Sequence, residues 1–186
     1  HPANSSNRPF ALLGPLLGCN EVSDIAQIKL LIIGPRSENE LFLYTSYGFK
    51  EENIKCLDLI SYSELITPGD MHDMPFTDEC FDVVVCGWVI AYSKNHELAV
   101  KEIMRVAKPG ALIAIGSDAN RRNPAERQQY SSVVQHERGY CLDSTGPVSS
   151  SDILFLFKGL IEKVVFDNST SALGRWANVI VKKKAS

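Results

Sequence analysis

The stretch FDVVVCGW at residues 81–88 is the strongest strand signal in the chain, because three consecutive valines lie within an apolar run. Residues 95–106 follow it, and Leu98, Ile103 and Val106 form an apolar stripe at helical spacing. Pro109-Gly110 is expected to end this helix and to start a second buried strand at residues 111–116. This alternation of strand and helix favours an α/β fold.

The same alternation continues on the N-terminal side. Residues 27–33 (QIKLLII) are predicted to form a buried strand that stops at Gly34-Pro35. Residues 37–48 are predicted to form a helix with acidic residues in its first turn and Gly48 as its stop. Residues 53–58 are predicted to form a second strand that ends in an acid. A possible strand at residues 64–67 follows so closely that either a tight loop connects it or the strand is vestigial.

The C-terminal third completes the predicted sheet. Residues 121–139 are polar and predicted helical, and residues 150–160 are predicted to form an apolar helix. Residues 161–166 and 177–183 are expected to pair as an antiparallel hairpin across a Ser/Thr/Gly loop. We therefore predict one domain with a Rossmann-like, mostly parallel sheet, in which residues 27–33 are central and the antiparallel hairpin closes one side. Residues 1–20 are interpreted as an N-terminal extension, and residues 117–150 as a polar insertion or lid.

Composition excludes several classes of protein. The chain has 186 residues, and its 19 basic and 22 acidic residues give a net charge of −3, so a nucleic-acid partner is not expected. The apolar runs are shorter than the about 20 residues that cross a bilayer, so no membrane partner is expected. Five cysteines without a C-x-x-C pair indicate neither a disulfide framework nor a metal site, and favour reduced thiols in a cytoplasmic protein.

Ligands of an open parallel sheet bind beyond the carboxyl ends of its strands. Asp58 ends the second predicted strand, and its carboxylate could accept hydrogen bonds from two ribose hydroxyls. The alternative interpretation is a helix cap or an exposed turn residue.

Two longer stretches resemble a known family. Residues 69–85 (GDMHDMPFTDECFDVVV), followed by residues 102–110 (EIMRVAKPG), are similar to the type 11 group of the class I S-adenosylmethionine-dependent methyltransferases. The resemblance runs from about residue 28 to residue 116. It implies a seven-stranded sheet with a reversed final hairpin, and S-adenosylmethionine as the cofactor.

The resemblance also assigns cofactor-binding roles. Gly34 and Glu38 are expected beneath the methionine part, Asp58 and the neighbouring Leu59 at the ribose, and Asp70 with the backbone of Met71 at the adenine edge. For Asp70 the alternative is a turn residue after Pro68-Gly69. Three residues at the end of the best strand are expected to face the reaction centre: Cys86, Gly87 and Trp88.

The first loop departs from the family pattern. Residues 34–40 (GPRSENE) contain one glycine where the family has several, and Pro35 has a fixed φ and no N–H. Arg36 either pairs with the methionine carboxylate of the cofactor or is a solvated surface charge.

Catalytic groups are less clearly marked. His72, Tyr92 and His96 flank the best strand and are candidate bases, although each can equally be a surface or hydrogen-bonded core residue. Several arginines crowd the polar segment after residue 117, which is either a solvated helix face or a cover that holds an acidic substrate.

Three functions compete. The sequence favours methyl transfer from S-adenosylmethionine to a small molecule, which the arginines suggest is acidic. The alternative is a non-catalytic domain of the same fold that serves as a binding or scaffold partner. A nicotinamide-dependent reductase is disfavoured, because no G-x-G-x-x-G follows the first strand. The sequence contains no signal that sets the oligomeric state.

Overall fold

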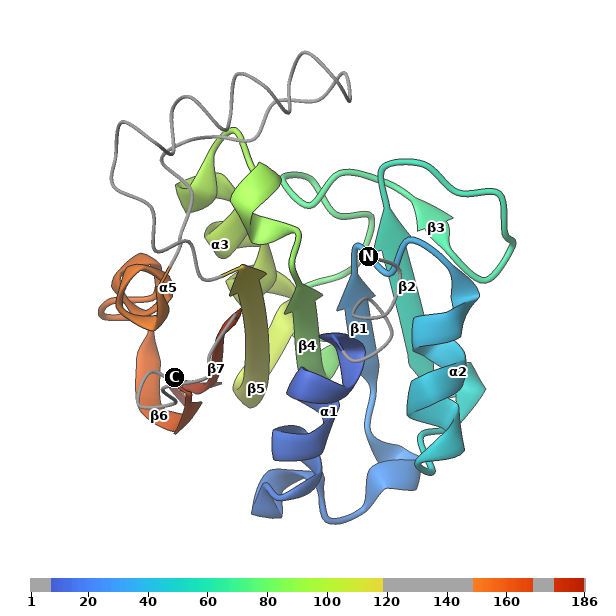
Figure 1. Ribbon diagram of the computed structural model, residues 1–186, viewed down its shortest axis with the longest axis horizontal. Coiled ribbons are helices and arrows are strands. Elements are labelled where there is room, and N and C mark those ends of the chain that lie inside the picture. The colour runs from blue at the N-terminus through green and yellow to red at the C-terminus, as the bar shows by residue number, and fades with distance from the viewer. Residues whose placement is uncertain (1–7, 119–148, 169–175, 186) are drawn as a thin grey trace.

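A seven-stranded sheet forms the middle layer of the computed structural model, which describes residues 8–118, 149–168 and 176–185 (Figure 1). The strands are β1 (Leu30–Ile33), β2 (Ile54–Asp58), β3 (Thr67–Pro68), β4 (Phe81–Gly87), β5 (Ala107–Asp118), β6 (Ile161–Asp167) and β7 (Trp176–Lys183). Their order across the sheet is β3-β2-β1-β4-β5-β7-β6. The first five strands pair in parallel, and β7 runs antiparallel to both β5 and β6. The predicted fold class and closing hairpin are confirmed, but β4 rather than β1 occupies the middle position.

Helices cover both faces of this sheet. They are α1 (Arg8–Leu17), α2 (Glu38–Ser46), α3 (His96–Val106) and α5 (Ser150–Leu156), with short 3-10 turns η2 (Asn20–Val22), η3 (Ile25–Gln27), η4 (Glu51–Asn53) and η5 (Ile90–Tyr92). One face packs its apolar side chains against α1 and α2, and the opposite face packs against α3 and α5 (Figure 1). Strand residues therefore alternate between two cores, which is why the central strands are apolar throughout.

The N-terminal segment forms a core helix. In α1, Leu12, Leu13 and Leu16 are fully buried, and the helix contacts β4, β5 and β7. The interpretation of residues 1–20 as a simple extension missed this helix. Its leucines follow the i, i+1, i+4 spacing of one helix face, but Gly14 and Pro15 obscured the helical pattern.

Several element boundaries differ from the predicted ones. β1 begins at Leu30, because residues 25–27 form the turn η3. β5 begins at Ala107, so Pro109-Gly110 lies within the strand, where its pairing with β4 shifts register and Gly110 has a φ of 76°. Both differences arise where a local irregularity is tolerated at the end of a strand.

The connection between β2 and β3 contains no helix. Residues 59–66 form bends and turns, and β3 has two residues, Thr67 and Pro68. The vestigial-strand alternative is therefore the observed one. It leaves the loop after Asp58 on the surface of the molecule, with Leu59 and Ile60 each 67% exposed and Tyr62 fully exposed.

Some expectations lie outside the described residues. These are the polar helix at residues 121–139, most of the expected lid at residues 117–150, and the arginines within it. Among the described part of the chain, no helix is long and apolar enough to cross a membrane.

Candidate functional site

The carboxyl ends of β1, β2, β4 and β5 meet at one edge of the sheet. The chain moves from β1 to β2 and β3 on one side, and β4 and β5 lie on the other side of β1. The sheet order therefore reverses between β1 and β4, which is the position where open α/β sheets bind their ligands. The loops that border this point begin at residues 34, 59, 69 and 88.

Gly34 is the first residue after β1, and chain packing alone requires it to be glycine. It has a left-handed φ of 74°, and a Cβ built on it would lie 2.2 Å from Val89 Cγ1. Its N–H donates to the carbonyl of Leu57 at 2.7 Å. The space beside this glycine is filled by Val89 from the loop after β4.

Arg36 and Asp58 are joined by a backbone contact. The Arg36 N–H donates to Asp58 Oδ2 at 3.1 Å, and Arg36 itself has a left-handed φ of 61°. A non-glycine residue in this region carries local backbone strain. The carboxylate of Asp58 therefore supports the loop after β1, and its second oxygen, Oδ1, is not used by that contact.

Asp70 lies at the same edge as Asp58. Asp58 pairs with Pro68 in the short ladder between β2 and β3, and Gly69 N–H donates to the carbonyl of Asp58 at 2.8 Å. Asp70 then follows directly. The structure thus brings the two acidic residues that the sequence singled out to one rim of the sheet, next to the exposed side chain of Leu59.

Asp70, His72 and Ser93 form a chain of hydrogen bonds. Asp70 Oδ1 accepts from the His72 backbone N–H at 2.9 Å and also contacts His72 Nδ1, while His72 Nε2 lies 2.7 Å from Ser93 Oγ. Burial acts to raise the pKa of Asp70, but the hydrogen bonds from His72 outweigh it and lower that pKa. Both ring nitrogens of His72 are engaged, so this residue joins the loop after β3 to the loop after β4.

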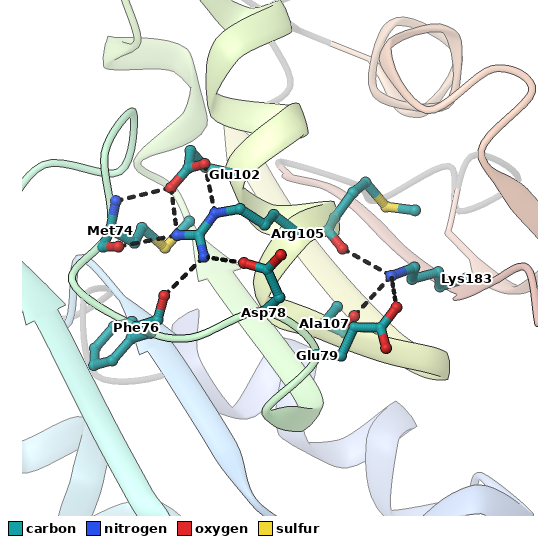
Figure 2. Close-up of polar contacts among 9 residues, drawn as sticks. Met74, Phe76, Asp78, Glu79, Glu102, Arg105, Ala107 and Lys183 are labelled. Carbon is teal, nitrogen blue, oxygen red and sulfur yellow. Dashed lines mark hydrogen bonds and ion pairs between the residues drawn. The ribbon is translucent and has the colours of Figure 1, made fainter. Parts of the chain in front are cut away.

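A charged cluster fastens the segment that leads into β4 (Figure 2). Glu102 Oε2 accepts from the backbone N–H of Met74 at 2.9 Å and pairs with Arg105 at 2.7 Å. The guanidinium of Arg105 also donates to the carbonyls of Met74 and Phe76 and to Asp78. The hydrogen bond from Arg105 lowers the pKa of Glu102 despite its burial, so the buried carboxylate stays ionised and paired.

Lys183 extends this support to the end of α3. Its Nζ donates to the carbonyls of Met104 and Ala107 at 2.9 and 2.8 Å, and it lies 4.0 Å from a carboxylate oxygen of Glu79 (Figure 2). A cation at a helix C-terminus satisfies carbonyls that have no partner within the helix. α3, β7 and the segment before β4 are thereby held together.

The three residues at the end of β4 have different surroundings. Cys86 is fully buried in the core on the α3 side, and burial raises the pKa of its thiol to about 12. Trp88 has a left-handed φ of 61° and packs edge-on against Trp176, with ring centroids 5.5 Å apart. Gly87 faces the opposite side of the sheet, where a Cβ would lie 3.6 Å from Glu40 Oε1 and 3.8 Å from Leu12 Cδ1.

Glu38 and Glu40 occupy different environments, although both begin α2. The hydroxyl of Ser63 lowers the pKa of the half-buried Glu38, which places Glu38 beside the loop after β2. Glu40 instead lies toward Gly87 and α1, and desolvation raises its pKa to about 7. The two acids of this helix turn therefore differ in their surroundings: Glu38 contacts the loop after β2, and the carboxyl group of Glu40 is desolvated.

The remaining candidate bases are separate from Asp58. Tyr92 ends η5 and is 41% exposed, and His96 is the first residue of α3. The Nε2 atom of His96 is buried without a hydrogen-bond partner among the described residues. In the same part of the chain, no group of three His, Cys, Asp or Glu residues is arranged to hold a metal ion.

Sequence reasoning missed three residues that shape this edge: Glu40, Val89 and Ser93. Glu40 precedes the buried Tyr44 by four residues, so the helical spacing already placed it on the buried face of α2. Val89 and Ser93 carried no comparable signal, because their roles depend on partners from distant loops.

Comparisons with known proteins agree with this fold. Residues 46–115 match the family model described as a methyltransferase domain. YcgJ from Bacillus subtilis superposes with a TM-score of 0.68 at 13% identity, covering 95% of this chain and 100% of that one. A SAM-dependent methyltransferase from Aquifex aeolicus gives 0.63 at 14% identity, covering 97% and 94%. Demethylmenaquinone methyltransferase of Staphylococcus aureus is 29% identical over 94 residues, which are 50% of this chain and 35% of that protein.

The chain has the fold of the class I S-adenosylmethionine-dependent methyltransferases, and its segment 46–115 matches the methyltransferase-domain family model. The resemblance that the sequence indicated is confirmed at this level. The chain spans about a third of the length of the curated relatives that it matches.

Proposed function

We propose that this chain binds S-adenosylmethionine and transfers its methyl group to a small molecule. The observation that carries the proposal is the position of Asp58 and Asp70 on one rim, next to the point where the strand order reverses between β1 and β4. The methyltransferase-domain match and the fold support methyl transfer as the reaction.

The nucleoside end of the cofactor fits the residues at this rim. Asp58 Oδ2 accepts from Arg36, which leaves Oδ1 available for the ribose hydroxyls. The exposed side chains of Leu59 and Ile60 offer an apolar surface beside it for a base. Asp70, whose Oδ1 is held by His72, has its second oxygen for the exocyclic amine of adenine, and the backbone of Met71 adjoins it.

The methionine end fits the space beside Gly87 better than the loop at Gly34. Val89 fills the space beside Gly34, whereas Gly87 faces the enclosed carboxyl group of Glu40. A carboxyl group that lacks a partner suits a ligand with positive charge. We therefore place this end of the site between α1, α2 and the end of β4.

When bound, the cofactor supplies a methyl group on a positively charged sulfur, which departs as a neutral thioether. The protein then has to align the two reactants and keep water away. Leu12 and Trp88 give this edge apolar walls. His72 is already held between Asp70 and Ser93, so its part is to position the two loops.

For the methyl acceptor we propose only its class, a small molecule. The curated relatives are named for demethylmenaquinone, but the match covers 35% of their length. An acidic acceptor is proposed from the arginines of residues 121–138, which lie outside the described residues. We propose neither a nucleic-acid nor a membrane partner.

A second function, a non-catalytic binding domain, is favoured by one observation. Val89 occupies the space beside the only glycine of the loop after β1, and Asp58 already accepts a hydrogen bond from that loop. Both contacts are made within the chain and need no ligand. A chain of this kind would keep the fold and bind no cofactor.

Calorimetric titration with S-adenosylmethionine and S-adenosylhomocysteine separates the two functions. The proposal expects the wild-type protein to bind both, and Asp58→Ala to weaken binding by at least tenfold, about 1.5 to 3 kcal/mol for a lost charged acceptor. Asp58→Asn keeps an acceptor for the Arg36 N–H and tests the ligand contact with less disturbance of the loop. Asp24→Ala, an exposed acid whose side chain caps no helix, is the matched control. Absence of binding at millimolar ligand would favour the non-catalytic function.

A further inference from the structure

Glu40 is a carboxyl group enclosed at the ligand-facing edge of the sheet. It projects from the first turn of α2 toward Gly87, and its Oε1 lies 3.6 Å from the position that a Cβ on Gly87 would take. Leu12 of α1 borders the same position at 3.8 Å. Gly87 and Glu40 both keep partial exposure, and no side chain of residue 87 stands between the carboxyl group and the end of β4.

No donor is provided for this carboxyl group by the described residues. No hydrogen bond or ion pair links it to another residue there, and desolvation by burial raises its pKa. The titratable groups that sense its charge are Tyr44 on its own helix, Cys56 in β2 and Cys86 in β4. All three have raised pKa values and are neutral at pH 7, and α1 contributes the apolar Leu12.

The surroundings of Glu40 are therefore those of an uncompensated anion. A buried carboxylate without a partner costs stability, and proteins keep such groups mainly where a ligand supplies the missing charge. Glu102 shows the contrast within this chain, because its buried carboxylate pairs with Arg105. The side chain of Glu40 also retains partial exposure, so the group is reachable from solvent.

We propose that the carboxylate of Glu40 binds a cationic group on the amino-acid end of S-adenosylmethionine, in the space beside Gly87. The inference rests on the proposed function, which supplies the ligand. That end of the cofactor carries two cations, the α-ammonium and the sulfonium, beside its own α-carboxylate, and either cation would neutralise the carboxylate of Glu40. Glu40 thereby contacts the amino-acid end of the cofactor, which the loop at Gly34 cannot approach closely because Val89 fills the space beside it.

Calorimetry with three ligands tests this pairing. S-adenosylmethionine carries both cations, S-adenosylhomocysteine keeps the ammonium and the α-carboxylate but lacks the sulfonium, and 5′-methylthioadenosine has neither cation nor the α-carboxylate but keeps the nucleoside. Each is titrated at pH 6 and pH 8 into the wild-type protein, Glu40→Gln and the control Glu52→Gln, which makes the same change at an exposed position. Thermal melting of each variant verifies the fold.

In the wild type we expect S-adenosylhomocysteine to bind more tightly than 5′-methylthioadenosine at pH 8, and this advantage to shrink at pH 6. Glu40→Gln is expected to lose at least tenfold in affinity for the charged ligands at pH 8, with its affinity for 5′-methylthioadenosine within twofold of wild type. A larger loss for S-adenosylmethionine than for S-adenosylhomocysteine would assign the carboxylate to the sulfonium, and equal losses would assign it to the ammonium.

Two other results overturn the inference. If Glu40→Gln binds the charged ligands as well as wild type does, or loses all three equally, Glu40 does not pair with a ligand cation. In both cases wild-type binding of the nucleoside leaves the proposed function intact. If the wild type binds none of the three ligands, the proposed function fails and the inference fails with it.

Discussion

The segment that leads into β4 and the loop that leaves β1 border the same proposed site, yet they are held in different ways. The first is fastened by the Glu102–Arg105 pair, which binds the backbone of Met74 and Phe76. In the second, Gly34 and Arg36 adopt left-handed backbone conformations, and the Arg36 N–H donates a hydrogen bond to Asp58. One region depends on paired charges, and the other depends on steric fit and on the carboxylate that would also bind the ligand.

This difference separates support from recognition. Charge pairs that satisfy one another need nothing from a ligand, so the Glu102–Arg105 cluster can hold Met74 and Phe76 in place at all times. At the loop after β1, the contact with Arg36 uses only one oxygen of Asp58, and the nearby Glu40 carboxyl group has no hydrogen-bond donor among the described residues. We expect ligand binding to affect the loop after β1 more than the segment before β4.

The largest effect is expected for Arg105→Ala. This change leaves Glu102 buried without its partner and removes the donors to Met74, Phe76 and Asp78. Breaking a buried pair from one side costs about 3 to 5 kcal/mol, and the partial exposure of Arg105 favours the lower end. Urea denaturation measures the loss, with Lys101→Ala, an exposed cation on the same helix, as control. Equal unfolding free energies of the two variants would show that the cluster does not stabilise the fold.

Gly34→Ala tests the sterically held loop. A Cβ at this position meets Val89 Cγ1 at 2.2 Å in a backbone conformation that L-residues avoid, so we expect a loss of about 2 to 3 kcal/mol in unfolding free energy. The double variant Gly34→Ala/Val89→Ala removes the collision and retains the φ penalty. Recovery of part of the loss, relative to Val89→Ala alone, assigns that part to the contact. No recovery would leave the φ of Gly34 as the entire cause.

Glu40→Gln should change how stability depends on pH. The pKa of Glu40 is about 7 in the folded chain against a reference of 4.5, so the folded state holds its proton over a range in which the unfolded state releases it. This group therefore contributes stability below about pH 4.5 that is lost as the pH rises to about 7. Above pH 7, Glu40→Gln should be more stable than wild type by on the order of 1 to 3 kcal/mol.

Melting curves of wild type and Glu40→Gln between pH 4 and 8 measure that difference. The advantage of the variant should grow between pH 4.5 and 7 and level off above it. Glu52→Gln should show no such growth, because Glu52 is exposed. A constant difference between wild type and Glu40→Gln would mean that the Glu40 carboxyl is not desolvated.

The smallest effect is expected for Ser93→Ala, which breaks the contact between the loop after β3 and the loop after β4. Ser93 is fully buried, and its hydroxyl contacts His72 Nε2 and accepts from the Asn95 N–H at 3.1 Å. Its loss should cost about 1 to 2 kcal/mol, as for one buried polar partner removed. Hydrogen exchange should then increase at His72 and Asn95 and stay unchanged at Met74, which Glu102 holds independently. Increased exchange at Met74 would show that the His72–Ser93 contact and the segment held by Glu102 open as one unit.

Much of the architecture could be predicted because it follows from local patterns. The apolar run in β4, the stripe of α3 and the final hairpin each carry their own periodicity, so their types were correct even where their ends moved. The acids Asp58 and Asp70 could be placed at one rim because strands of known direction end there. Helix α1 was missed because Gly14 and Pro15 weaken the helical pattern, while burial of its leucines on the sheet stabilises the helix.

The sequence by itself determined the order of strands and helices and which acids end near the switch point, since these depend on periodicity and on chain direction. The tertiary structure alone decided that Val89 covers Gly34, that His72 joins Asp70 to Ser93, and that Glu40 lies unpaired beside Gly87. These contacts join loops that are far apart in the chain, and the charge state of each group follows from the partners it meets there. The residue type determines which groups a side chain can bind, whereas its burial and its neighbours determine whether a partner within the protein already occupies it.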